Sequence, residues 1–392
     1  MSRALQSIRR SVLASFARAR EVLPRAANDA LFHLPTRVAD NTPALARANG
    51  WPLVDLGPNA IKLPVAVDET AYAPTLAILN AGISLDGRDA RAFAVRIPRG
   101  RVLGLACSAV APDGIALADV SPHPEEPLAR HRALTSFAVA PAPRRIAGNC
   151  ALIGAIGHNN FYHWMLDVLP RIGLVRAAGF GAIDHWIVAE SKLAVARELL
   201  AHCGIERDRL VAVGRGGHVE CEHLVVTSAP GKICQPTPRS VEFLRATFAR
   251  ERGIGGGGRR IYVARRGRRK VDGEAELAPV LKRYGIESVA MEDLSLDAQI
   301  SAFRGASLIV GAHGAALANI VHADHGAALV ELMPPGYLNH TYFLLAGACA
   351  LRYLPIVGHP LAAEGSKRVT DRDFRVEATQ LDRALSAVEL CA

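Results

Sequence analysis

Apolar and polar positions follow two different patterns along the chain. Up to about Ser121, short apolar stretches such as "AFAVRIP" and "RVLGLACSAV" are separated by segments rich in proline and glycine. Short apolar runs between turn-forming residues are typical of short strands, so we predict an irregular, strand-rich N-terminal region. A second proline-rich passage, which begins "SPHPEEPLAR", leads into a more regular part of the chain.

After Arg145, short apolar runs alternate with longer amphipathic stretches. Such alternation indicates a parallel sheet with helices on its faces. In the first half of this regular part we predict strands at "CALIGAIG", "DHWIVAE", "LVAV" and "HLVVTSA", and helices over residues 159–177, 192–202 and 239–252.

The alternation restarts after the glycine run "GIGGGG" at residues 253–258. Here the pattern predicts strands at "RRIYVARR", "ESVAME", "SLIVGA", "AALVELM" and "RYLPIVG". It predicts helices over residues 274–284, 296–305, 340–350 and 377–388, and one that begins near Ala315. The second half is therefore a strand–helix repeat of its own.

The domain prediction rests on length and on the glycine run. A chain of 392 residues exceeds one ordinary domain, and consecutive glycines form a flexible linker. We predict a basic N-terminal helical segment (residues 1–50), an N-terminal α/β domain (51–252) and a C-terminal Rossmann-like domain (259–392). The fold class is α/β, with two Rossmann-like domains facing a cleft, where ligands usually bind.

Composition indicates which partners and which cellular compartment suit the protein. The formal net charge of +9 favours anionic partners. The seven cysteines are scattered without a CxxC pair, which argues against a zinc cluster or a disulfide framework and indicates a reducing, cytoplasmic compartment. No apolar run reaches the ~20 residues that span a bilayer, and no continuous apolar segment marks a secretory signal.

The first 25 residues carry six arginines against one glutamate, with apolar residues at roughly helical spacing. A basic amphipathic helix of this kind can lie on an anionic leaflet, and a transit peptide has a similar composition. A plain docking helix is the third interpretation. We expect a cytoplasmic protein, with peripheral contact at the inner face of the membrane as an open alternative.

The segment "SLIVGAHGAALANIVHA" carries the first candidate binding site. A buried strand leads into Gly311, His313 and Gly314 and then into a helix, so unpaired backbone N–H groups gather at the strand tip. This arrangement suits a phosphate. It lacks the GxGxxG spacing and the P-loop lysine, which argues against NAD and ATP. The alternative is a tight turn whose glycines serve packing alone.

The segment "YVARRGRRKVDGEAEL" places five basic residues within positions 265–270, directly after a strand. Arginine offers a planar fork for phosphate oxygens, and so dense a cluster is favoured by a nearby anion such as a diphosphate. A solvated loop that binds nothing is the alternative. Nucleic acid is disfavoured because no aromatic residues interleave with the arginines to stack bases.

Glu331, in "ALVELMPPGY", also follows a buried strand. A carboxylate at a strand end can accept hydrogen bonds from a ribose or sugar hydroxyl, and a helix-capping role is the alternative.

The segment "GHNNFYHWMLDVLPRI" places polar residues at the start of an apolar helix. His163 and Asp167 lie four apart and therefore share one helix face. A hydrogen-bonded pair of this kind can act as a general base, with either residue taking the proton, or can be purely structural. A zinc site made of His158, His163 and Asp167 departs from the HExxH spacing, so we predict no metal.

Four segments together resemble glycosyltransferase family 61. They are "NFYHWMLDVLPRI", "YVARRGRRKVDGEAEL", "LSLDAQISAFRGASLIVGAHGAALANIVHA" and "ALVELMPPG", and the resemblance covers roughly residues 102–357. The resemblance implies an inverting, nucleotide-sugar-dependent transferase with a GT-B-like fold, in which the first domain serves the acceptor and the second the donor. Bacterial members often take part in capsular or other surface polysaccharide synthesis.

The resemblance also implies roles for individual residues. It implies that Arg265 and Arg269 contact the nucleotide diphosphate, and that His163 and Asp167 reach the cleft from the N-terminal domain. It implies that His313, Gly314 and Asn319 line the donor pocket and that Glu331 sits beside it. Gly311 is a further candidate for nucleotide-sugar binding. One departure is that the Asn-Glu pair usual in the family is Gly273-Glu274 here, which leaves the identity of the donor more open.

We therefore expect a hexosyl- or pentosyltransferase that needs no cofactor and uses a nucleotide sugar as co-substrate. The catalytic candidates are His163, Asp167 and His313, and the acceptor is a glycan or lipid-linked glycan. No DxD-like acidic pair occurs near the implied pocket, so transfer is expected to be metal-independent. The alternatives are a nucleotide-sugar epimerase and a catalytically silent polysaccharide-assembly protein that only binds.

Overall fold

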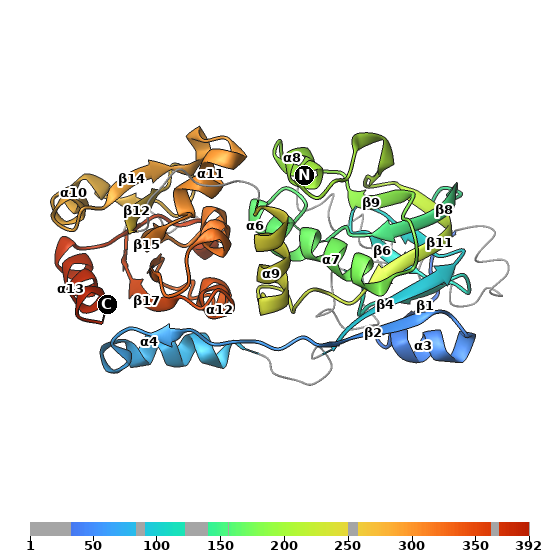
Figure 1. Cartoon of the computed structure of the whole chain (residues 1–392), viewed down its shortest axis with the longest axis horizontal. Coiled ribbons are helices and arrows are strands. Elements are labelled where there is room, and N and C mark those ends of the chain that lie inside the picture. The colour runs from blue at the N-terminus through green and yellow to red at the C-terminus, as the bar shows by residue number, and fades with distance from the viewer. Residues whose placement is uncertain are drawn as a thin grey trace, which may run out of the picture. The chain divides into compact units, whose positions relative to one another are not determined.

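The structure is a computed structural model that describes residues 33–83, 91–121, 140–155, 157–249, 258–361 and 368–391. The chain forms two compact units, shown in Figure 1. The first comprises Met1–Pro58 and Arg88–Pro230, and the second comprises Asn59–Gly87 and Gly231–Ala392. The predicted N-terminal helix and all but the last residue of the glycine run lie outside the described residues.

The first unit is built on one mixed sheet. Within the described residues this sheet has ten strands, of which β8, β9, β10 and β11 run parallel in the order β11-β8-β9-β10. The short strands expected before Ser121 pair at the other end of this sheet. The strands are β1 (Arg37–Ala39), β2 (Leu53–Pro58), β4 (Arg91–Pro98), β5 (Arg101–Leu103), β6 (Ser108–Val110), β7 (Ile115–Leu117), β8 (Arg144–Leu152), β9 (His185–Ala189), β10 (Leu210–Val213) and β11 (His218–Thr227).

The helix predicted over residues 159–177 is present but is not a single α-helix. It consists of α6 (Phe161–His163), a π-helical turn η3 (Trp164–Val168) and α7 (Leu169–Ala178). Pro170 has no N–H group and cannot continue the regular i→i−4 bonding, and the Leu169 N–H bonds Trp164 O five residues back. The other helices of this unit are α3 (Thr42–Asn49), α8 (Ala196–His202) and η4 (Arg207–Arg209).

The second unit is a doubly wound α/β unit. Its main sheet is parallel throughout, in the order β14-β12-β15-β16-β17-β3. All residues of the central strand β16 are buried, as expected for a strand covered on both faces. The strands are β3 (Val65–Ala66), β12 (Arg259–Ala264), β14 (Glu287–Ala290), β15 (Ala306–Ala312), β16 (Ala328–Met333) and β17 (Arg352–Val357), and a small second sheet holds β13 (Val271–Asp272), β18 (His359–Pro360) and β19 (Phe374–Arg375).

The strand order of the second unit marks a ligand site. From β12 the chain first moves outward to β14, on one side of β12. It then returns to β15, on the other side of β12. The carboxyl ends of β12 and β15 therefore flank the point where the order reverses, and ligands of open α/β sheets bind at such a point. Arg265 directly follows β12, and His313 and Gly314 directly follow β15.

The helices predicted after the glycine run are present except that one has a different form, whereas helix α4 (Glu69–Ala81) of this unit was not predicted. The helix expected from Ala315 is the 3₁₀-helix η6 (Ala315–His322), not an α-helix. A 3₁₀-helix is the tighter form, with poorer hydrogen-bond geometry. The others are α4 (Glu69–Ala81), α9 (Pro238–Thr247), α10 (Glu274–Arg283), η5 (Met291–Asp293), α11 (Leu296–Phe303), α12 (Thr341–Ala348), η8 (Val369–Asp371) and α13 (Ala378–Leu390).

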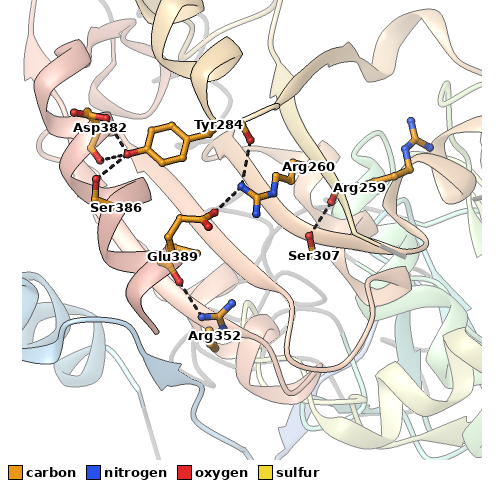
Figure 2. Close-up of polar contacts among 9 residues, drawn as sticks. Arg259, Arg260, Tyr284, Ser307, Arg352, Asp382, Ser386 and Glu389 are labelled. Carbon is orange, nitrogen blue, oxygen red and sulfur yellow. Dashed lines mark hydrogen bonds and ion pairs between the residues drawn. The ribbon is translucent and has the colours of Figure 1, made fainter. Parts of the chain in front are cut away.

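The last helix, α13, is held on the second unit by polar contacts as well as by its apolar face (Figure 2). Arg260 donates to Glu389 Oε1 at 2.5 Å and to the backbone carbonyl of Tyr284 at 3.2 Å. The Tyr284 hydroxyl lies 2.9 Å from Asp382 Oδ1 and 2.7 Å from Ser386 Oγ. These contacts tie α10 and β12 to α13, behind the carboxyl edge of the sheet.

The division into units differs from the predicted boundary at the glycine run. Helix α9, expected to end the first domain, belongs to the second unit. Its Arg245 donates to three backbone carbonyls of that unit, those of Val321 (2.8 Å), Ala323 (2.9 Å) and Cys349 (3.3 Å). Residues 59–87 also join the second unit, because β3 pairs with β17. Neither long-range contact has a local sequence signal.

Within the residues that the structure describes, none of the helices has both the length and the apolar character needed to span a bilayer.

The role of Arg245 gives a stability prediction. Arg245→Ala should destabilise the second unit by about 2–3 kcal/mol, because partly buried carbonyls lose a charged donor. Chemical unfolding followed by circular dichroism measures this loss. Lys282→Ala, an exposed cation on α10, is the matched control and should change stability by less than about 0.5 kcal/mol. Equal effects of the two substitutions would contradict the assignment.

Candidate functional site

The first unit holds the predicted histidine–carboxylate pair. His163 Nδ1 lies 2.6 Å from Asp167 Oδ2, and the two side chains are 16% and 14% exposed. The pair lies beyond the carboxyl end of β8, at the first turns of the helix that follows. Between residues 162 and 172, these two are the only positions that are not buried. The polar start of this apolar helix therefore presents one small polar face.

The local backbone is arranged around His163. Asn160 caps the helix, since its side-chain oxygen accepts from the Tyr162 N–H at 2.9 Å. The Trp164 indole N–H donates to His158 O at 2.8 Å, and this bond closes the loop that precedes α6. Gly157 has a φ of 72°, and a Cβ added there would lie 2.0 Å from His163 Cδ2. Glycine adopts this positive φ readily and has no Cβ to clash with the ring. The imidazole of His163 therefore packs directly on the loop backbone.

A buried arginine lies one turn further along the same helix. Arg171 is 2% exposed and donates to the backbone carbonyls of Val120 (3.2 Å) and Thr227 (3.3 Å). Burial lowers the pKa of its guanidinium to about 10, while the charge of Asp167 acts to raise it. The sequence analysis did not select this residue. The available signal was an arginine four positions after Asp167 inside an apolar stretch.

The second unit holds another histidine–carboxylate pair, which the sequence analysis did not predict as a pair. His313 Nδ1 lies 2.5 Å from Glu331 Oε1, and the Tyr353 hydroxyl donates to Glu331 Oε2 at 2.5 Å. The Glu331 side chain is fully buried. Both oxygens of Glu331 are engaged inside the protein, where the carboxylate holds His313. A contact of Glu331 with a ribose or sugar hydroxyl stays a prediction.

Aromatic side chains enclose His313. The rings of Tyr342 and Tyr337 contact it edge-on, with centroids 5.1 and 5.4 Å away. The Tyr342 hydroxyl donates to Gly314 O at 2.6 Å. Burial raises the pKa of both Tyr342 and Tyr353 well above the usual value, so the two phenols stay protonated and act as donors. His313 is thus fixed in one orientation.

Arg265 lies directly against Gly314. A Cβ added to Gly314 would be 1.5 Å from Arg265 Nη1, so the guanidinium fills the space that a side chain would need. Burial lowers the pKa of Arg265, and the neighbouring charge of Arg269 lowers it further. Two arginines thus lie close together at the switch point between β12 and β15. Desolvated, mutually repelling cations favour an anionic ligand.

Arg269 extends this cationic site. It has a φ of 61°, donates to Thr370 O at 3.2 Å, and lies with its guanidinium carbon 5.6 Å from the centre of the Tyr337 ring. The other arginines of the loop have carboxylate partners: Arg266 binds Asp293, and Arg268 binds Asp371 at 2.8 Å. The dense basic run is therefore partly neutralised within the protein, which leaves Arg265 and Arg269 as its ligand-binding candidates.

Two residues expected in the pocket, Asn319 and Gly311, make packing contacts. Asn319 is fully buried, and its amide donates to Gln299 Oε1 (3.3 Å) and Ala316 O (3.2 Å). It ties η6 to α11, while its Oδ1 is buried without a hydrogen-bond partner among the described residues. Its place in a donor pocket stays a prediction. Gly311 is also a packing glycine, since a Cβ there would lie 2.9 Å from a Leu317 methyl group. The packing alternative raised for the glycines thus holds for Gly311, whereas Gly314 makes room for Arg265.

Comparison with known proteins identifies the class of the chain. Residues 161–330 match a family model of glycosyltransferases. That family is Glycosyltransferase 61, and the match covers 170 of the 392 residues of the chain. The matched range includes His163, Asp167, Arg265, Arg269 and His313, and it ends one residue before Glu331. Comparison with curated proteins gives no match.

The contact between Gly314 and Arg265 gives a test of the cationic site. Gly314→Ala should displace the Arg265 guanidinium, because the added methyl group occupies its position. Loss of one charge-assisted contact should weaken the binding of nucleoside diphosphates about 10- to 100-fold, as measured by calorimetry.

Gly267→Ala is the matched control for this test. Gly267 lies in the same arginine-rich loop, and a Cβ there would meet open space at an ordinary φ. Its diphosphate affinity should equal that of the wild type. Unchanged affinity in Gly314→Ala, with the protein folded, would remove Arg265 from the binding site.

Proposed function

We propose that this glycosyltransferase is an inverting, metal-independent enzyme that transfers a hexosyl or pentosyl group from a nucleotide sugar to a hydroxyl of a glycan or lipid-linked glycan. The observation that carries the proposal is the close pair Arg265 and Arg269 beside His313, at the switch point of a doubly wound sheet. Such a site suits a nucleoside diphosphate group.

The second unit would bind the donor. Arg265 and Arg269 would carry positive charge toward the diphosphate and stabilise it as it leaves. His313 would add a ring nitrogen, Nε2, because its Nδ1 is engaged with Glu331. Arginines at a water-poor site can supply this stabilisation without a metal ion, which is why we propose metal-independent transfer.

The first unit would supply the base. In the proposed step, the His163–Asp167 pair takes the proton of the acceptor hydroxyl, and the acceptor oxygen attacks the anomeric carbon from the side opposite the diphosphate. The bond from that carbon to the diphosphate oxygen breaks, and its electrons leave with the diphosphate. One displacement inverts the configuration, and the charge is balanced by the proton held on the pair.

This mechanism requires both units to act on one substrate pair, as in the GT-B-like arrangement that the family resemblance implies. The first unit contributes four parallel strands of a mixed sheet and the second a parallel sheet, each with polar residues beyond its carboxyl strand ends, which supports the proposal. We further propose a role in bacterial surface or capsular polysaccharide synthesis at the cytoplasmic side of the membrane, where nucleotide sugars are the donors.

A panel of nucleotide sugars tests the donor and the reaction together. The true donor should raise the melting temperature, because it binds the folded state, and should yield a glycosylated product only when a glycan acceptor is added. Product formation should continue in EDTA. An altered sugar formed without any acceptor would indicate an epimerase. Binding without turnover on the native acceptor would indicate a silent assembly protein, and loss of activity in EDTA with rescue by manganese would overturn metal independence.

Asp167→Asn tests the proposed base. The substitution should leave nucleotide-sugar affinity unchanged and lower kcat at least ~100-fold, because an amide cannot orient and balance the imidazole as a carboxylate does. Steady-state kinetics and calorimetry measure the two effects. Asp208→Asn, an exposed carboxylate on η4 of the same unit, is the control and should retain full activity. Wild-type turnover in Asp167→Asn would reduce the pair to a structural role.

A further inference from the structure

Tyr337 lies between two groups of the site that we propose for the donor, and it comes from a third segment of the chain. Its ring meets the ring of His313 edge-on, with the centroids 5.4 Å apart. The guanidinium carbon of Arg269 lies over the same ring, 5.6 Å from its centre. Arg269 belongs to the loop after β12, His313 follows β15, and Tyr337 follows β16. One half-buried ring therefore connects the cationic loop with the strand tip that carries the histidine.

A tight turn places this ring. The Tyr337 N–H donates to the carbonyl of Pro334 at 3.2 Å, with Pro335 and Gly336 between them. Gly336 has a φ of 78°, as the third position of a type II turn requires. Proline fixes φ at the second position of such a turn, so the backbone before the ring has little freedom. The place of Tyr337 is thus determined locally, directly after the buried strand β16.

The arginines of the loop are held in two different ways. Arg266 and Arg268 each bind a carboxylate of a neighbouring segment, so their charges are balanced within the protein. Arg269 instead donates to a neutral backbone carbonyl and packs on a neutral ring. Its Nε is buried and has no hydrogen-bond partner among the described residues. Arg269 is therefore held in place while its charge stays unbalanced.

An aromatic ring can hold a guanidinium without neutralising it. The negative face of the ring attracts the cation, and the N–H groups that do not face the ring remain available to oxygen acceptors. A carboxylate in the same place would occupy those N–H groups and repel a bound diphosphate. An arginine without any support would lose rotamer freedom when the ligand binds, which weakens binding. A ring therefore suits an arginine that must be fixed in advance and still present its charge to an anion.

We propose that Tyr337 is a positioning residue of the diphosphate site: its ring face holds the guanidinium of Arg269 without neutralising it, and its contact with the imidazole fixes this cation relative to His313. The inference deepens the proposed function and rests on it for its catalytic meaning. It assigns the role to the ring of Tyr337 and not to the hydroxyl.

Calorimetry with inorganic pyrophosphate tests the proposal, because this probe carries the diphosphate charge without a nucleoside or a sugar. Tyr337→Phe keeps the ring and should bind pyrophosphate as the wild type does. Tyr337→Leu removes the ring but stays apolar, and it should weaken binding about 3- to 20-fold through the loss of one cation–π contact. Equal affinities of the two variants, or a wild type that does not bind pyrophosphate, would overturn the proposal.

A double-mutant cycle shows whether the ring acts through Arg269. In an Arg269→Met background, which lacks the guanidinium, Tyr337→Leu should change the affinity for pyrophosphate by less than about 2-fold. A general disturbance of the turn would weaken binding by the same factor in both backgrounds. That outcome would leave Tyr337 a structural residue.

Fluorination of the ring decides the matter if Tyr337→Leu shows no thermal unfolding transition or if Arg269→Met binds too weakly to measure. Phenylalanine with one, two or three ring fluorines, incorporated at position 337, keeps its shape while its ring face becomes less negative. The affinity for pyrophosphate should then fall stepwise with each added fluorine, because the attraction to Arg269 weakens. An affinity that does not depend on fluorination would reject the role of the ring.

These results are separable from those of the nucleotide-sugar panel, which is scored by product. Product formation, together with an unchanged affinity of Tyr337→Leu, would reject the role of Tyr337 and keep the reaction. No product with any donor, together with ring-dependent binding of pyrophosphate, would reject the proposed reaction and keep the role of Tyr337 in anion binding.

Discussion

Two carboxylates that are largely withdrawn from water determine how the candidate site is built. An ionised group in such a place must find donors inside the protein, and each carboxylate takes the Nδ1 side of a histidine as one of them. Glu331 has a buried phenol as a second donor, whereas the buried Arg171 follows Asp167 on the same helix and donates to backbone carbonyls. Because both carboxylates are held by the fold, the histidines lose their freedom to rotate and present one defined nitrogen each.

The parallel sheets bring these groups to their positions. Polar side chains at the carboxyl edge of a parallel sheet come from segments far apart in the sequence, since each strand ends at the same edge. In the second unit, Arg265 follows β12, while His313 and Gly314 follow β15. The missing Cβ of Gly314 then allows a large cation to reach the backbone of the neighbouring strand tip. The site therefore depends on one very small residue as much as on the charged ones.

The sequence predicted well what local spacing determines. Most helices and strands after Arg145 agree with the apolar periodicity, and the His163–Asp167 pair follows from a spacing of four. Long-range partners were not predictable in this way. The sequence does not show that Tyr353, 22 residues after Glu331, donates to the second oxygen of that carboxylate. It also does not show the bond of Asn319 to Gln299, which needs the packing of η6 on α11.

The division of the chain into units also has a consequence for protein engineering. The chain passes from one unit to the other after Pro58, again after Gly87 and finally after Pro230. The second unit takes its edge strand β3, and helices α4 and α9, from segments that precede the glycine run. A fragment cut at those glycines would lose all three elements. Neither unit is thus a contiguous cassette, and exchanging the second unit between relatives would require three junctions in place of one.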